Sequence, residues 1–138
     1  MSVLKRLSML KYGMEITSLT ETEQIMINML ISLVLDRFDI ESIYLFGSRA
    51  RSSGHTESDI DIAIIVNDDL SVKKMTRNII DLSILVEEEA GVAGELMLSP
   101  IVLTKLHLSS SIGLGKKIME EGVLLWSKRS KTRKGKPI

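Results

Sequence analysis

The chain has 138 residues, within the usual size of one globular domain, and enough apolar residues to build a core. It contains no cysteine, which excludes disulfide bonds and thiolate metal sites. No apolar run approaches the roughly 20 residues of a membrane helix. We therefore expect a soluble, cytoplasmic protein with no membrane contact.

The formal net charge of zero conceals an uneven distribution of charge. Six of the 18 basic residues and none of the acidic residues follow Trp126, so residues 1–126 carry a net charge of −6. An acidic body offers no evident surface for a polyanion, which makes nucleic acid an unexpected partner. Residues 127–138 are predicted to form a solvated, disordered basic tail, the one segment that could contact nucleic acid.

Residues 1–19 have only a short apolar pattern and are predicted to form an N-terminal arm. A helix is predicted to begin after Thr20, because Thr20 and Glu23 have the spacing of a capping box, and to end between Arg37 and Asp39. Its apolar residues recur at helical spacing over a broad face. Such a face indicates burial against more than one surface, within the domain or against a partner chain, and the sequence leaves both open.

Two strand patterns follow, separated by a polar loop. The first is the run Ile43–Phe46, rich in β-branched and aromatic residues, which stops at Gly47-Ser48. Residues 49–51 can open a short helix. The second strand covers residues 59–66 and begins with two acidic residues followed by an apolar run.

The two acids of the second strand, Asp59 and Asp61, are two residues apart, so their side chains point to the same face. Adjacent carboxylates repel each other unless a cation lies between them, and Mg²⁺ binds carboxylate oxygens while leaving positions for phosphate oxygens. Gly47 allows the backbone to approach a phosphate without a Cβ, and Ser48 offers a hydroxyl and an N–H at a helix N-terminus. This stretch therefore predicts a site for the phosphates of a nucleotide.

The next predicted helix is capped by Ser71 and carries an apolar stripe from residue 72 to residue 86. It is expected to end at residues 87–89, before Gly91 or Gly94. A third strand is predicted over 95–103.

That third strand contains Pro100, which cannot donate a ladder hydrogen bond and so favours a sheet edge or a bulge. Residues 109–111, all serine, are expected to cap a helix that Gly122 closes, and residues 123–126 form a short last strand or an apolar clasp. The order of elements predicts an α/β (α+β) fold, a mixed β-sheet of 3–4 strands packed by about four helices.

Gly47-Ser48, ten intervening residues and Asp59-x-Asp61 resemble the signature of the DNA polymerase β-like nucleotidyltransferase superfamily. The closest likeness is to its minimal nucleotidyltransferases (MNT), small single-domain proteins often paired with a HEPN-type partner. The resemblance covers residues 20–126, which we interpret as the nucleotidyltransferase domain, and it implies a small α/β nucleotidyltransferase core.

The resemblance also implies the roles of the site residues. Asp59 and Asp61 would be catalytic and would hold one or two Mg²⁺ ions that bridge the triphosphate of ATP or another NTP. Gly47 and Ser48 would bind the nucleotide. Arg49 and Arg51 could clamp phosphates or pair with nearby acids, and Arg51 is interpreted mainly as a support for the loop.

A third carboxylate usually completes the metal site in this superfamily and can act as general base. The corresponding strand here reads Glu95-Leu96-Met97-Leu98-Ser99-Pro100, and the alignment places Met97 where the acid is expected. Glu95 would share a strand face with Met97 and Ser99, so Glu95 is the candidate third catalytic carboxylate. If Glu95 does not reach the site, metal binding should weaken and catalysis should be slow or absent.

The leading hypothesis is a Mg²⁺-dependent enzyme that transfers a nucleoside monophosphate, AMP from ATP, to a hydroxyl of a partner protein. By analogy with MNT proteins, it would be an antitoxin that modifies a tyrosine of a HEPN ribonuclease. The alternative is a non-catalytic partner-binding subunit with a degenerate nucleotidyltransferase site. Transfer to a small molecule ranks last, because the chain shows no extra substrate-binding segment, and a homo-oligomer is compatible with the sequence.

Overall fold

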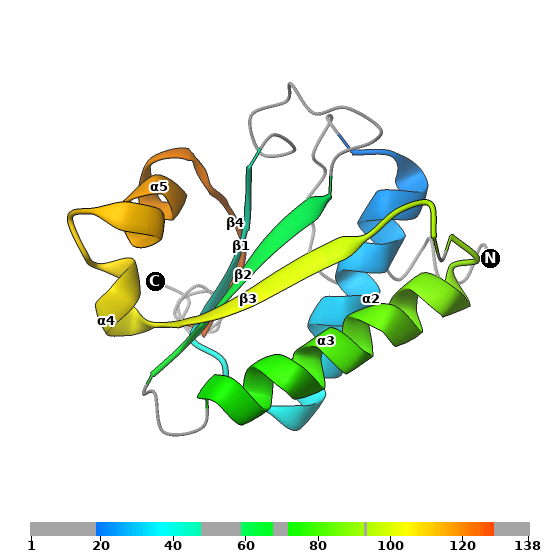
Figure 1. The fold of residues 1–138 in the computed structure, drawn as a ribbon, viewed down its shortest axis with the longest axis horizontal. Coiled ribbons are helices and arrows are strands. Elements are labelled where there is room, and N and C mark those ends of the chain that lie inside the picture. The colour runs from blue at the N-terminus through cyan, green and yellow to red at the C-terminus, as the bar shows by residue number, and fades with distance from the viewer. Residues whose placement is uncertain (1–18, 48–58, 68–71, 93, 129–138) are drawn as a thin grey trace, which may run out of the picture.

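The computed structural model describes residues 19–47, 59–67, 72–92 and 94–128. Over these residues, four strands form one sheet in the order β3-β2-β1-β4, and four helices pack on it (Figure 1). In chain order the elements are α2 (Glu21–Arg37), β1 (Ser42–Phe46), β2 (Ile60–Val66), α3 (Val72–Glu89), β3 (Leu98–Thr104), α4 (Lys105–Leu108), α5 (Gly113–Glu121) and β4 (Val123–Ser127). The α+β class is the one predicted.

The sheet is mixed, as expected. β2 pairs in parallel with β3 and antiparallel with β1, and β1 pairs antiparallel with β4. β3 is therefore an edge strand, which agrees with the position of Pro100 opposite Ile62. The sequence allowed either a strand or an apolar clasp at residues 123–126. The structure shows that the segment 123–127 is a strand of this sheet.

α2 begins at the predicted capping box. The Glu23 backbone N–H donates to Thr20 Oγ1 (3.1 Å), and the Thr20 N–H donates to Glu23 Oε1 (2.9 Å). A cap of this kind contributes about 1 kcal/mol to helix stability. The broad apolar face is buried within the domain: even Ile27 and Ile31, outside the main stripe, are only 3% and 2% exposed.

The two faces of the sheet are covered by different helices (Figure 1). Ile60, Ile62 and Ile64 of β2 point into the main core with α2 and α3. The alternate β2 residues Ala63 and Ile65 pack on the opposite face, which we call the α4/α5 face, with Phe46 of β1, Ile118 of α5 and partly buried Leu108 of α4. Alternation along β2 thus separates a large core from a smaller one.

The start of the third strand differs from the prediction. β3 begins at Leu98, and the preceding residues, including Glu95, form a turn in which the Glu95 N–H donates to Val92 O (2.8 Å). Gly94, with φ of +88°, lets the chain reverse there after α3. The buried carboxylate of Glu87 accepts the Leu98 N–H (2.8 Å), so the end of α3 fixes where the strand starts.

The segment between β3 and β4 also departs from the prediction. The sequence did not indicate the short helix α4, whose first turn is capped by Thr104 Oγ1, an acceptor for the His107 N–H (3.1 Å). Helix α5 has Ile112 at its N-cap with no side-chain hydrogen bond, so the serines at 109–111 do not cap it. It does end at Gly122, as predicted.

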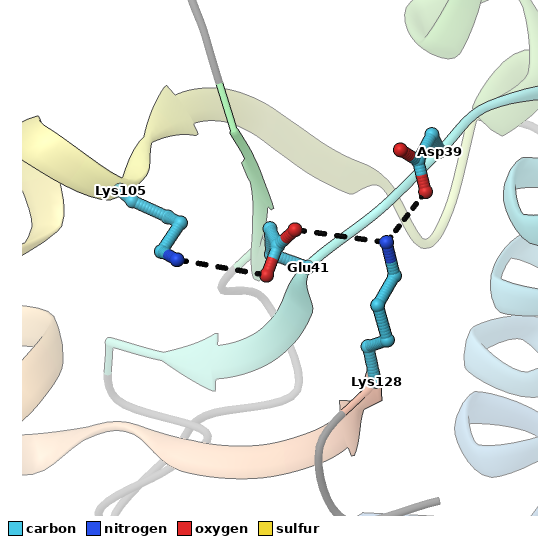
Figure 2. Close-up of polar contacts among 4 residues, drawn as sticks. All are labelled: Asp39, Glu41, Lys105 and Lys128. Atoms are coloured by element: carbon cyan, nitrogen blue, oxygen red, sulfur yellow. Dashed lines mark hydrogen bonds and ion pairs between the residues drawn. The ribbon is translucent and has the colours of Figure 1, made fainter. Parts of the chain in front are cut away.

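At the end of the sheet where β1 begins, charged residues next to the strands form ion pairs with one another (Figure 2). Lys128 Nζ lies 2.7 Å from Asp39 Oδ1 and 3.6 Å from Glu41 Oε2, and Lys105 Nζ lies 3.9 Å from Glu41 Oε1. The hydrogen bond from Lys128 to Asp39 raises the pKa of this lysine. Such exposed ion pairs contribute little to the free energy of folding. The network lies where the residues that flank β1, β3 and β4 meet.

None of the helices in the ranges that the model describes has the length and apolarity needed to span a membrane.

Candidate functional site

The acid pair lies at the opposite end of the sheet from the charged network. There β1 ends and β2 and β3 begin: Asp61 is paired with Phe46 of β1 on one side and with Ser99 of β3 on the other. Because Phe46 packs on the α4/α5 face and is the cross-strand partner of Asp61, the Asp61 side chain belongs to this face. The site is therefore formed where three neighbouring strands meet the α4/α5 side of the sheet.

Asp59 and Asp61 are close enough for the charge of Asp59 to act on the carboxyl of Asp61. β2 begins at Ile60, so Asp59 lies exposed just before the strand and not within it as predicted, whereas Asp61 is half-buried within β2. Burial raises the pKa of the Asp61 carboxyl above its ordinary value of 3.8, the negative charge of Asp59 raises that pKa further, and the positive charge of Lys117 lowers it. The folded chain thus holds a concentration of negative charge at the start of β2.

Glycine is favoured at position 47 by the backbone conformation and by the nearby Asp61 carboxylate. Gly47 has φ of +78°, which L side chains rarely adopt, and a Cβ built on it would collide with Asp61 Oδ2. The backbone at the end of β1 consequently lies directly against Asp61. The sequence predicted a close approach of the Gly47 backbone to a phosphate, which stays a prediction, and the structure shows that this backbone lies close to the Asp61 side chain.

No third carboxylate accompanies the pair among the residues that the model describes. The β3 residue beside Asp61 is Ser99, and the residue before the strand, Met97, is 55% exposed and accepts the Ile60 N–H through its carbonyl (2.9 Å). Glu95 is exposed in the turn before β3 and not on a strand face with Met97 and Ser99. Within the described ranges, no group of three or more His, Cys, Asp or Glu residues could hold a metal ion.

Three of the predicted nucleotide-binding residues, Ser48, Arg49 and Arg51, lie outside the described residues. The predicted residues that the structure brings together are Gly47, Asp59 and Asp61.

The sequence did not indicate that the charge of Lys117 acts on Asp61. Lys117 lies on α5, far along the chain from the strand that carries Asp61, and its charge reaches that carboxylate. No local motif surrounds Lys117, because its place is set by the packing of neighbouring Ile118 against the sheet. Only the tertiary structure can show such a residue.

The acid pair fits a divalent cation of the Mg²⁺ type. Hard cations prefer carboxylate oxygens, and the pair supplies these from two adjacent side chains. Burial and the charge of Asp59 raise the pKa of Asp61, and a bound cation would oppose both effects by stabilising the carboxylate. Two protein carboxylates would leave coordination positions for water and for phosphate oxygens.

Comparisons with known proteins give a family and several structural likenesses. A family model described as "Polymerase beta, Nucleotidyltransferase" matches residues 28–131. No curated protein sequence matches the chain.

Among solved structures, a toxin-antitoxin structure with AMP-PNP has 23% identity and a TM-score of 0.44 and covers 77% of each chain. A mutant MntA-HpeT toxin-antitoxin structure has 22% identity and a TM-score of 0.46, over 77% of this chain and 76% of that one. A Sulfolobus solfataricus protein described as a nucleotidyltransferase has 21% identity and a TM-score of 0.40, over 91% of this chain and 89% of that one. With the family model matching most of its length, the chain belongs to the polymerase β-type nucleotidyltransferase family.

Proposed function

We propose that this protein is a Mg²⁺-dependent nucleotidyltransferase that transfers AMP from ATP, or another nucleoside monophosphate from its triphosphate, to a hydroxyl group. The observation that carries the proposal is the acid pair at the start of β2, in which Asp59 acts electrostatically on Asp61, with the Gly47 backbone against Asp61. It occurs in a chain whose family model describes a nucleotidyltransferase.

The residues of the site would have different roles in binding the cation and in orienting the triphosphate. Asp59 and Asp61 hold the divalent cation, which when bound supplies charge neutralisation for the triphosphate and the developing transition state. The Gly47 backbone leaves room for phosphate oxygens beside the pair. The acceptor oxygen forms a bond to the α-phosphorus, the bond to the bridging oxygen of the β-phosphate breaks, pyrophosphate leaves, and the hydroxyl proton is released.

The acceptor that we propose is a partner protein. The minimal nucleotidyltransferases that the sequence resembles pair with HEPN-type proteins, and the described part of the chain has no second domain that would bind a large acceptor. In this proposal the chain is the antitoxin of such a pair in the cytoplasm and modifies a hydroxyl of the toxin.

Transfer of radiolabel tests the proposed activity. The chain is incubated with Mg²⁺, α-labelled ATP and the proteins that co-purify with it from its native host, beside an Asp59→Asn/Asp61→Asn variant. We expect label on a partner protein with the wild-type chain only. Absence of transfer from each of the four α-labelled NTPs, with the partner present, would refute the enzymatic proposal.

A second function is favoured by one observation, the absence of a third carboxylate beside Asp61 in the described structure, where β3 offers Ser99. A site of this kind could be a remnant in a subunit that neutralises its partner by binding alone. That function predicts that the Asp59→Asn/Asp61→Asn variant binds the partner and suppresses its toxicity as well as the wild-type chain does. Loss of suppression with binding retained would exclude it.

A further inference from the structure

Helix α3 has one long side buried and the other exposed. Ile79, Leu82 and Val86 belong to the main core, and the helix lies at the outside of the fold next to α2 (Figure 1). On the other side two large apolar residues one turn apart remain open to solvent: Ile80 is 42% exposed and Ile84 is 47% exposed. The folded chain therefore presents an apolar strip that its own described residues leave uncovered.

The apolar strip continues with charged residues in both directions along the helix. At 3.6 residues per turn, the spacing places five exposed residues along one line of α3: Lys73, Arg77, Ile80, Ile84 and Glu88. We call these five residues the α3 stripe. It is basic at its N-terminal end, apolar in the middle and acidic at its C-terminal end. None of the ion pairs that join described residues includes its charged members.

The order of charges on α3 is opposite to the one that stabilises a single helix. The helix dipole places positive partial charge at the N-terminus and negative partial charge at the C-terminus. The first turn of α3 nevertheless contains Lys73 and Lys74 and no acid, and its last turn contains Glu88 and Glu89 and no base. The charge pattern is therefore unfavourable in the single helix, and an oppositely directed helix alongside would compensate it.

A second copy of the same helix supplies such a neighbour. In a pair related by a two-fold axis the helices run antiparallel, and each contact occurs twice. With the axis at the level of residue 82, Ile80 of each chain lies over Ile84 of the other. Arg77 lies five residues before that level and Glu88 six residues after it. Each arginine therefore meets the glutamate of the other chain to within one residue, about 1.5 Å along the helix.

We propose that the α3 stripe is a self-association surface, through which two copies of the chain form an antiparallel, two-fold symmetric dimer. Its apolar centre consists of two isoleucines, far less than a stable interface of about 800 Å² per partner contains, so the dimer is reversible and forms as the concentration of the chain rises. The stripe lies on the α2/α3 side of the sheet, so this dimer leaves the α4/α5 face open in both copies. The inference does not depend on the proposed function.

Sedimentation equilibrium of the full chain over a range of concentrations measures the association. The variants are Arg77→Glu, Glu88→Arg and the double variant that combines them. Glu89→Arg is the matched control, because it makes the same change of charge about 100° further round the helix. All three side chains are exposed, so each variant should keep the circular dichroism spectrum of the wild type.

We expect the wild-type chain to approach twice the mass of one chain as its concentration rises. Removal of one exposed charge costs little, but its reversal sets like charges face to face at two symmetric places. Each single reversal should therefore raise the dissociation constant of the dimer by at least about tenfold. The double variant exchanges the two charges and should restore most of the affinity, and Glu89→Arg should associate as the wild type does.

Disulfide cross-linking tests the direction of the pairing, because the chain has no cysteine of its own. In the antiparallel dimer the two copies of residue 84 are about 6 Å apart along the helix, whereas the two copies of residue 73 are about 27 Å apart. Ile84→Cys should consequently form a covalent dimer on oxidation, and Lys73→Cys should not.

Four results would overturn the inference. They are a chain that stays monomeric at every concentration, a dimer that both single reversals leave unchanged, a double variant no tighter than the single ones, and equal cross-linking at residues 73 and 84, which indicates a parallel pair. If the wild-type chain is monomeric and Arg77→Glu abolishes its binding to a co-purifying protein, the α3 stripe binds that protein and not a second copy.

Discussion

At the scale of single residues, Asp61 shows a conflict between stability and function. Its carboxylate is partly buried beside Asp59, and both burial and repulsion favour the protonated form, so its pKa is raised. A group whose pKa is higher in the folded state than in the unfolded state stabilises the fold when protonated. That stabilisation is lost as the pH rises from 3.8 through the raised value. Near neutral pH the charge of Asp61 therefore destabilises the folded chain.

Replacing this aspartate should consequently stabilise the protein. We expect Asp61→Asn to increase the free energy of unfolding at pH 7 by less than about 1 kcal/mol, since solvent screens a half-exposed charge. The increase should disappear below pH 3.8, where the wild-type carboxyl is protonated as well. Urea unfolding at several pH values checks this, with Asp81→Asn on the exposed side of α3 as the control. A variant less stable than the wild type at pH 7 would contradict the account.

Gly47 offers a second test at this scale, because the chain contains a matched glycine. Gly47 and Gly91 have φ values of +78° and +74°, but a Cβ at Gly91 would have no heavy atom within 4 Å. Gly91→Ala should lose about 1 kcal/mol of stability through backbone strain alone. Gly47→Ala should lose more and also weaken binding of Mg²⁺ and nucleotide, because the new Cβ displaces the Asp61 carboxylate. Equal effects of both variants on stability and binding would show that the close approach to Asp61 is unimportant.

At the scale of secondary-structure elements, the end of α3 determines where β3 begins. The buried Glu87 carboxylate accepts the Leu98 N–H, and β3 then passes beside Asp61 at Ser99. Glu87→Ala should reduce the free energy of unfolding by about 1–3 kcal/mol, since a buried donor loses its partner. The exposed neighbour Glu88, changed to Ala, should have an effect within about 0.5 kcal/mol. Urea unfolding measures both, and hydrogen exchange at the Leu98 amide should quicken only in Glu87→Ala; identical behaviour of the two variants would contradict this role.

The same contact explains why the sequence placed the third strand wrongly. The segment 95–103 is apolar enough for a strand throughout, but the turn after Gly94 and the Glu87 contact delay the start of pairing to Leu98. These are tertiary effects that hydrophobic periodicity does not reveal. By contrast, α2 was predictable at both ends because its signals are local: a capping box at Thr20 and the loss of helical spacing after Arg37.

At the scale of the whole molecule, the sheet separates a structural side from a functional side. The larger core with α2 and α3 fills one face, and Asp61 belongs to the other, which α4 and α5 cover (Figure 1). The sequence predicted the α+β class, the mixed sheet and the strand that carries Asp61, because each follows from periodicity. The roles of Asp59 and Asp61 in a site stay predictions. The sequence did not predict α4 or the effect of the Lys117 charge on Asp61, because both depend on how segments distant in sequence pack together.

The central claim is that Asp59 and Asp61 bind a divalent cation together with a nucleoside triphosphate. Mn²⁺ can replace Mg²⁺ as a paramagnetic probe, and titration of the purified chain with Mn²⁺ and a non-hydrolysable ATP analogue, followed by electron paramagnetic resonance, tests the claim directly. We predict nucleotide-dependent binding of Mn²⁺ to the wild-type chain and to Asp81→Asn, and its loss in Asp59→Asn/Asp61→Asn. Equal binding by the double variant, or no binding by the wild-type chain, would contradict the claim.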